Sequence, residues 1–212
     1  MIKVISFDLD GTLVDMDYNR IFWDEIVPEL YSEKHKISLA DAKEIVLSEI
    51  NSVGNQNLNF YDPHFWFSKF NIGNFSEIVK ETKKYVKLYP DVREAMETLG
   101  RKYTLIVVSN ATKEVVELKI RAEGLEDHFS RIFSVVDDFG TLKSAKVFEG
   151  IMTRMSIDIH DIVHVGDDVI FDYEIPKSIG IRSFLIDRNG GKKGEDVIKD
   201  LRDIEDKIKS IY

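Results

Sequence analysis

The stretch from Ile2 to Leu13 reads IKVISFDLDGTL. Its first half is a run of apolar and β-branched residues, which predicts a buried strand. The run ends at Asp8 and Asp10, and Gly11 marks a sharp turn of the backbone. Acids two residues apart in an extended chain lean to the same side, so the two carboxylates can share one small site. Carboxylates held together repel each other, and such a pair needs a cation or a proton between them. An ordinary strand that ends in an Asp-Gly turn explains neither the second acid nor the Gly-Thr pair.

The composition limits the classes of function. The chain has 212 residues, of which 43% are hydrophobic, enough for a core domain that carries a smaller inserted one. Its net charge of -9 argues against sequence-independent binding to nucleic acid and against binding to an anionic membrane surface. An anionic substrate must then meet a local cationic group or a metal ion. The lack of cysteine excludes disulfides and thiolate chemistry. We find neither a leader pattern before Ile2 nor a run of about 18 apolar residues, and we expect a cytoplasmic protein.

Residues 15–89 read as helices and loops with no convincing strand. The apolar spacing predicts helices over 18–31 and 38–54. We expect a third helix to begin at Asp62-Pro63 and a fourth to be capped by Ser76. Four short helices can form a small bundle, so we predict that this segment is an inserted α-helical cap domain.

From Pro90 onward, helices and strands alternate. The predicted strands cover 103–108, 132–136, 162–165 and 181–186, and the predicted helices cover 91–99, 112–123, 144–155, 172–178 and 196–211. This alternation predicts an α/β fold, a doubly wound parallel sheet with helices on both faces. We therefore assign residues 1–14 and 90–212 to a Rossmann-like core and 15–89 to the cap.

Polar side chains follow the predicted strands, at the edge where open parallel sheets bind ligands. They are Asp8 and Asp10 after the first strand, Ser109 and Asn110 after the second, Lys143 after the third, and Asp167, Asp168 and Asp172 after the fourth. Each has an ordinary alternative: a helix cap for the Ser-Asn pair, a solvated surface lysine, and acids of a turn or a helix N-terminus. These alternatives do not explain why every group falls at the carboxyl end of a strand.

The order of these residues resembles the haloacid dehalogenase (HAD) superfamily of phosphotransferases and hydrolases. Its four motifs match DLDGT at 8–12, VVSN at 107–110, Lys143 before a helix, and GDDVIFD at 166–172. The insertion lies where many members carry a cap. The resemblance implies a magnesium-dependent phosphomonoester hydrolase that acts on a small phosphorylated metabolite through an aspartyl-phosphate intermediate.

The resemblance also implies a role for each matching residue. Asp8 matches the nucleophile, and Asp10 matches the general acid/base that protonates the leaving alcohol and then activates water. The implied Mg²⁺ ligands are Asp8, Asp167, the backbone carbonyl of Asp10, and Asp172 as a ligand or outer partner. The implied phosphate-binding residues are Lys143, Ser109, Asn110 and Thr12, the last also as a brace of its loop.

The sequence departs from the family pattern at two places. Lys143 is followed by Ser144 where proline is usual, and the spacing to Phe148 is one residue short, so Lys146 competes for the role of the lysine. Asp168 stands where a smaller residue is common. Whether Asp168 or Asp172 is the outer metal ligand therefore stays open.

Other functions remain open on the sequence. The family's dehalogenases lack an acid at the position of Asp10, which argues against a 2-haloacid dehalogenase. A sugar-phosphate mutase of the β-phosphoglucomutase type shares the core motifs and a helical cap. A regulatory or interaction domain that kept the fold predicts the loss of Asp8, Lys143 or a metal aspartate, and none of these is missing. The sequence defines neither the substrate nor the oligomeric state.

Substrate choice is expected to lie in the cap and its hinges. Asn19 and Arg20 follow the first motif and can reach a substrate, although an exposed helical arginine is the more ordinary interpretation. An aromatic cluster either lines the entrance or, as we favour, forms the core of the cap: Phe60, Tyr61, Phe65, Trp66, Phe67 and Phe70. His164 lies within a strand, and we expect it to be packed rather than to bind a ligand.

Overall fold

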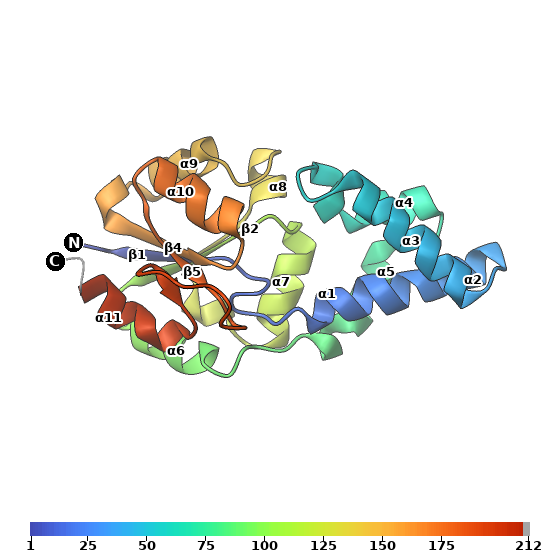
Figure 1. The fold of residues 1–212 in the computed structure, drawn as a ribbon, viewed down its shortest axis with the longest axis horizontal. Coiled ribbons are helices and arrows are strands. Elements are labelled where there is room, and N and C mark those ends of the chain that lie inside the picture. The colour runs from blue at the N-terminus through green and yellow to red at the C-terminus, as the bar shows by residue number, and fades with distance from the viewer. Residues whose placement is uncertain (210–212) are drawn as a thin grey trace.

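The computed structural model describes residues 1–209, which contain a six-stranded sheet in the order β3-β2-β1-β4-β5-β6 (Figure 1). The strands are β1 Val4–Phe7, β2 Thr104–Ser109, β3 Arg131–Ser134, β4 Ile162–Gly166, β5 Arg182–Ile186 and β6 Val197–Ile198. Every pair of neighbouring strands is parallel. All four residues of β1 are buried, as expected for a strand covered on both faces. The predicted doubly wound α/β fold is confirmed, with β1 between β2 and β4.

Helices cover both faces of the sheet. On one face lie α6 Val92–Gly100, α7 Lys113–Ala122 and α11 Ile204–Lys209, and on the other α8 Val135–Phe139, α9 Ala145–Met155 and α10 Ile175–Ser178. Alternate residues of each strand supply the two cores. In β1, Ile5 and Phe7 pack with the first set of helices and Val4 with the second.

The segment between β1 and α6 is helical and extends away from the sheet (Figure 1). Its elements are α1 Asp17–Ile21, η1 Phe22–Ile26, α2 Val27–His35, α3 Leu39–Val53, η2 Leu58–Tyr61, α4 Pro63–Phe70, α5 Phe75–Thr82 and η3 Lys83–Tyr85. Trp66, Phe67 and Phe70 of α4 are buried in its centre, as expected for a core, whereas Phe60, Tyr61 and Phe65 are half-buried. No helix in residues 1–209 combines the length and the apolar character that a membrane span requires.

A short ribbon joins the helical segment to the sheet. The Asp15 amide donates to the Lys87 carbonyl at 2.9 Å, Val14 pairs antiparallel with Leu88, and the Tyr89 amide donates to the Leu13 carbonyl at 3.1 Å. The chain therefore leaves the sheet and returns to it along two adjacent connections.

Arg188, which follows β5, braces this ribbon from the side of the sheet. Its Nη1 donates to both carboxylate oxygens of Asp91, at 2.8 and 2.7 Å, and its Nη2 donates to the Thr12 carbonyl. The guanidinium also stacks 4.1 Å from the centre of the Tyr89 ring. One half-buried cation thus contacts both connections.

Two predicted helices are interrupted by π-helical turns. The helix predicted over 18–31 contains η1, and the helix predicted over 172–178 begins as η6 Val169–Glu174. Each π-turn ends two residues before a proline, Pro28 or Pro176. Proline has no N–H, and its ring excludes the carbonyl four residues earlier, so a widened turn accommodates it.

Several boundaries differ from the prediction, and the first helical stretch runs to His35 rather than to 31. The third strand stops at Ser134 rather than at 136, because the Ser134 hydroxyl accepts from the Asp137 amide and begins α8. The helix predicted over 196–211 starts instead as the edge strand β6, and only 204–209 are α-helical, while 210 and 211 lie outside the described residues. Asn74 rather than Ser76 caps α5, because its side chain accepts from the Ser76 amide.

Candidate active site

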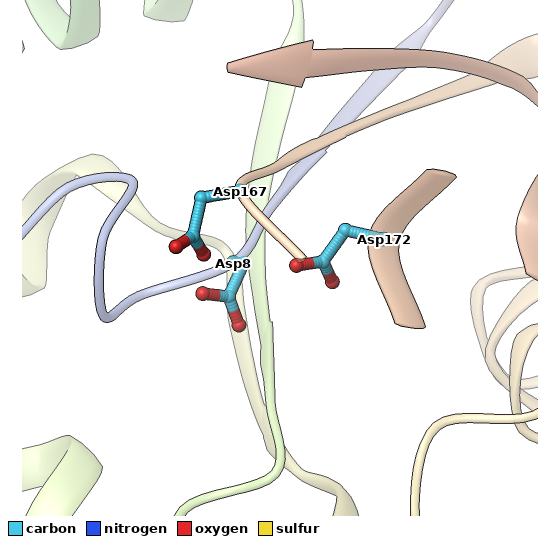
Figure 2. Close-up of side chains that lie close together, drawn as sticks. All are labelled: Asp8, Asp167 and Asp172. Carbon is cyan, nitrogen blue, oxygen red and sulfur yellow. The ribbon is translucent and has the colours of Figure 1, made fainter. Parts of the chain in front are cut away.

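Three carboxylates converge at the carboxyl edge of the sheet (Figure 2). Asp8 follows β1, Asp167 follows β4 and Asp172 belongs to η6, and one oxygen of each lies within 4.8 Å of the others. Glycines permit this approach. Gly11 has φ +78°, and a Cβ there would lie 2.2 Å from the Asp167 carboxylate, while a Cβ on Gly166 would lie 2.3 Å from Cγ of Asp172.

Lys143 supplies a positive charge to this cluster. Its buried Nζ lies 2.5 Å from Oδ1 of Asp8 and 2.6 Å from Oδ1 of Asp172. The Asn110 side chain fixes the lysine backbone, because its Oδ1 accepts from the Lys143 amide at 2.8 Å. Lys146 is exposed on α9. The geometry therefore brings Lys143, and not Lys146, to the acids.

Burial and mutual repulsion set the charges of the acids. Burial raises the pKa of Asp8 well above its usual range, Lys143 opposes the rise, and Asp172 and Asp167 add to it. Burial, with repulsion from Asp172, raises the pKa of Asp167 to about 7. The pKa of Asp172 lies below its usual value despite its burial, because Lys143 and His164 stabilise the carboxylate.

The acid cluster fits a hard divalent cation. Among the described residues, Lys143 is the one lysine or arginine paired with these acids; its ammonium contacts Asp8 and Asp172, and no ion pair joins it to the half-buried Asp167. Oxygen donors in such a group suit Mg²⁺, and a bound cation would relieve the repulsion that raises the pKa of Asp167.

His164 lies behind the cluster and was not predicted to contact it. It is fully buried, as expected, with Nε2 3.0 Å from Oδ1 of Asp172 and Nδ1 2.8 Å from the Ser6 hydroxyl. Burial lowers its pKa. The sequence did offer a signal for this contact: a polar residue in a central parallel strand is buried, and a buried polar group needs a hydrogen-bond partner.

The side chain of Asp10 does not join the three acids. Its Oδ1 instead accepts from the Nζ of Lys119, at 2.5 Å, and Lys119 is fully buried. Sequence reasoning missed this lysine. The signal was its place on the apolar stripe of α7, beside Val115, Val116 and Ile120.

The other predicted residues occupy different places. Ser109 is buried beside the site, and its Oγ accepts from the Ala111 amide at 3.2 Å. Thr12 is fully buried, and it is not among the described residues that line the cavity. Its carbonyl accepts a hydrogen bond from Arg188. Asp168 caps η6, with Oδ1 accepting from the Ile170 and Phe171 amides at 2.8 Å each. Asp172, rather than Asp168, therefore joins the acid cluster.

A cavity of about 490 Å³ lies between the acids and the helical segment. Aromatic side chains from the helical segment form its wall: Tyr18, Phe22, Trp23, Phe60, Tyr61 and Phe75. Of the described residues that line it, six are acidic and three are basic, and each basic side chain already contacts an acid. The basic residues are Arg20, Lys119 and Lys143. The cavity is thus acidic at the sheet and aromatic at the helices.

Residues 5–186 match the haloacid dehalogenase-like hydrolases, a match that spans all four predicted motifs. The chain belongs to this family. This HAD hydrolase is similar in structure to the HAD phosphatase from Thermococcus onnurineus, with a TM-score of 0.88 and 27% identity over 98% of each chain. It shares the fold of a 2-haloacid dehalogenase from Pseudomonas syringae, with a TM-score of 0.69 and 21% identity over the full length of both chains.

Curated relatives match a smaller part of this HAD hydrolase. The GMP/IMP nucleotidase YrfG of Escherichia coli is 24% identical over 136 residues, which cover 63% of this chain and 60% of the relative. The haloacid dehalogenase-like hydrolase domain-containing protein 3 of Danio rerio is 33% identical over 87 residues, 41% of this chain and 36% of the relative. The chain thus covers less than two thirds of the length of these relatives.

Proposed function

We propose that this HAD hydrolase is a magnesium-dependent phosphomonoester hydrolase that acts on small phosphorylated metabolites through an aspartyl-phosphate on Asp8. The observation that carries the proposal is the contact of Lys143 with Asp8 inside a buried cluster of three acids, at the floor of a cavity large enough for an organic phosphate. The similarity to a HAD phosphatase over 98% of the chain supports it.

In the first step, an oxygen of Asp8 attacks phosphorus and the bond from phosphorus to the ester oxygen breaks. Lys143 and the Ser109 hydroxyl hold the phosphoryl oxygens, because both lie buried beside Asp8 at the cavity. Asp10 donates a proton to the departing oxygen, which leaves as an alcohol. The Asn110 side chain keeps Lys143 in place through the lysine amide.

In the second step, Asp10 takes a proton from water as the water oxygen attacks phosphorus. The bond from phosphorus to Asp8 then breaks, which releases phosphate and restores the carboxylate. Asp8, Asp167, Asp172 and the backbone carbonyl of Asp10 would hold Mg²⁺. When bound, the ion would neutralise charge on the phosphoryl group and the acids, so that an anion can approach.

The cavity wall supports an uncharged, flat leaving group. Each basic side chain of the described lining already contacts an acid, so a second anionic group on the substrate would have to compete with a carboxylate for its cation there. Aromatic rings can stack on a planar group. Nucleoside monophosphates have such a leaving group, and the relative YrfG is a GMP/IMP nucleotidase. We propose this substrate class as the first to test.

Phosphate release tests the proposal. The panel contains p-nitrophenyl phosphate, alkyl phosphates, sugar phosphates and nucleoside monophosphates, each with and without Mg²⁺. The native chain is compared with Asp8→Asn, which keeps the size of the side chain but removes the nucleophile. We expect metal-dependent release and a loss of at least about 10⁴-fold in Asp8→Asn. A native chain that binds Mg²⁺ but releases no phosphate would overturn the hydrolase and favour a mutase or a non-catalytic domain.

A further inference from the structure

We propose that Lys119 is a positioning residue for Asp10, and that it makes the orientation of the Asp10 carboxylate depend on the position of helix α1. The inference rests on the proposed function, in which Asp10 is the general acid and base.

The geometry joins three separate elements at one ammonium group. Lys119 lies in the last turn of α7 and is fully buried. Its Nζ contacts Oδ1 of Asp10 at 2.5 Å and Oδ1 of Asn19 at 2.8 Å. The same Nζ lies 4.4 Å from the centre of the Tyr18 ring. Asp10 belongs to the loop after β1, while Asn19 and Tyr18 belong to α1.

Packing alone does not call for a lysine at this position. Its neighbours on the buried stripe of α7 are Val115, Val116 and Ile120, and an apolar side chain would fill the same space. A buried ammonium costs free energy unless it is paired, and an apolar group of similar size is often as stable. The ammonium instead lies at the cavity beside Asp10, whose side chain stays 20% exposed.

The contact restricts Asp10 in a way that suits proton transfer. Lys119 holds Oδ1, which leaves Oδ2 as the oxygen to exchange a proton with the leaving group or with water. A carboxylate fixed at one oxygen loses little freedom when the other reacts, and errors of about 1 Å in such a group can reduce the rate by about 10²-fold.

Asn19 adds the dependence on α1. The helix begins directly after the ribbon, and the next turn carries Phe22 and Trp23 into the cavity wall. When α1 occupies this position, Asn19 orients the ammonium toward Asp10. When α1 moves away, the ammonium loses this contact. Asp10 is therefore best oriented when the aromatic wall is in place over a substrate.

The test compares leaving groups. The p-nitrophenolate anion is stable and departs without a proton, whereas an alkoxide needs the proton from Asp10. We measure kcat/KM, which reports the steps up to phosphoryl transfer, for p-nitrophenyl phosphate and propyl phosphate. The variants are Lys119→Met, which keeps length without charge, Lys119→Arg, which keeps the charge, and Asn19→Leu. Asp10→Asn is the reference for complete loss of the proton donor.

We expect Lys119→Met to lose at least about 10-fold more kcat/KM on propyl phosphate than on p-nitrophenyl phosphate, in the direction of Asp10→Asn. In Lys119→Arg, the excess loss on propyl phosphate should be smaller than in Lys119→Met, because the positive charge is kept. Asn19→Leu should also show a smaller excess loss than Lys119→Met. Lys113→Met is the matched control, since Lys113 is exposed on the same helix and its variant should equal the native chain. Thermal unfolding and Mg²⁺ titration show that each variant is folded.

Equal losses on both esters, or no loss, overturn the positioning role while the phosphatase stands. If Lys119→Met does not fold, Asn19→Leu decides: unequal losses support the role and equal losses overturn it. A native chain that releases phosphate from no ester of the full panel overturns the proposed function and this inference with it.

Discussion

The carboxyl edge of the sheet and the wall of the helical segment face each other across one cavity, but they are built differently. At the edge, ion pairs of defined geometry join the charged groups, as those of Lys143 with Asp8 and Asp172 do. At the wall, Phe22 and Phe75 contact each other as rings 5.7 Å apart, with no directional bond. Paired charges in a buried space tolerate little change, whereas ring contacts can be rearranged. We therefore expect substitutions at the edge to abolish chemistry and those at the wall to alter substrate choice.

The largest effect is expected for Lys143→Met. The change leaves Asp8 and Asp172 buried without their cation, and breaking a buried ion pair costs about 3–5 kcal/mol. Loss of a phosphate-binding charge should also lower kcat by about 10²-fold or more. Urea unfolding and initial rates measure the two effects, and added Mg²⁺ should recover part of the stability. A free energy of unfolding for Lys143→Met within about 1 kcal/mol of that of the native chain would show that the edge tolerates an unpaired charge.

An intermediate effect is expected for Phe60→Ala at the wall. Phe60 is half-buried and lines the cavity, so its loss should raise KM for a nucleoside monophosphate by about 10-fold, or 1.4 kcal/mol. The kcat should change little, because the edge is untouched. Phe67→Ala is the contrast: Phe67 is 1% exposed in the helical core, and its loss should cost about 3–5 kcal/mol of stability. A fall in kcat for Phe60→Ala with KM unchanged would remove the distinction between edge and wall.

The smallest effect is expected for Lys146→Met. Lys146 is exposed on α9, only three residues from Lys143, and surface substitutions of this kind change stability by less than about 0.5 kcal/mol. Phosphate release should match that of the native chain. The two methionine variants, assayed side by side, test the choice between the lysines that the sequence left open, and a large loss in Lys146→Met would reverse it.

The sequence predicted the fold well, because its signals are local. The apolar run before Asp8 and the Gly-Asp-Asp turn after β4 mark strand ends, and parallel strands bring such ends to one edge. The boundaries that failed depend on competition between neighbours. Val135 and Val136 favour a strand by type, but the Ser134 cap commits them to α8.

The contacts that the sequence did not predict are long-range. Lys119 and Asp10 are 109 residues apart, and nothing local indicates that a lysine on an apolar stripe will meet that acid. His164 meets Asp172 only because η6 turns back over β4. The aromatic residues of the helical segment have the same difficulty. Phe60 at the cavity and Trp66 in the core are indistinguishable by residue type, and only the packing separates them.

The two adjacent connections at Leu13–Asp15 and Lys87–Tyr89 have a consequence for how such a chain can change over generations. The helical segment begins and ends at two hydrogen-bonded stretches of the chain. The sheet therefore constrains only the positions of these two ends and not the length of the segment between them. Doubling the length of a closed flexible loop adds only about 0.6 kcal/mol of closure entropy. Insertions, deletions or exchange of whole helices between these points would leave the order of the strands intact. The inserted segment can therefore vary between related proteins while the residues at the edge of the sheet, and the reaction they support, stay the same.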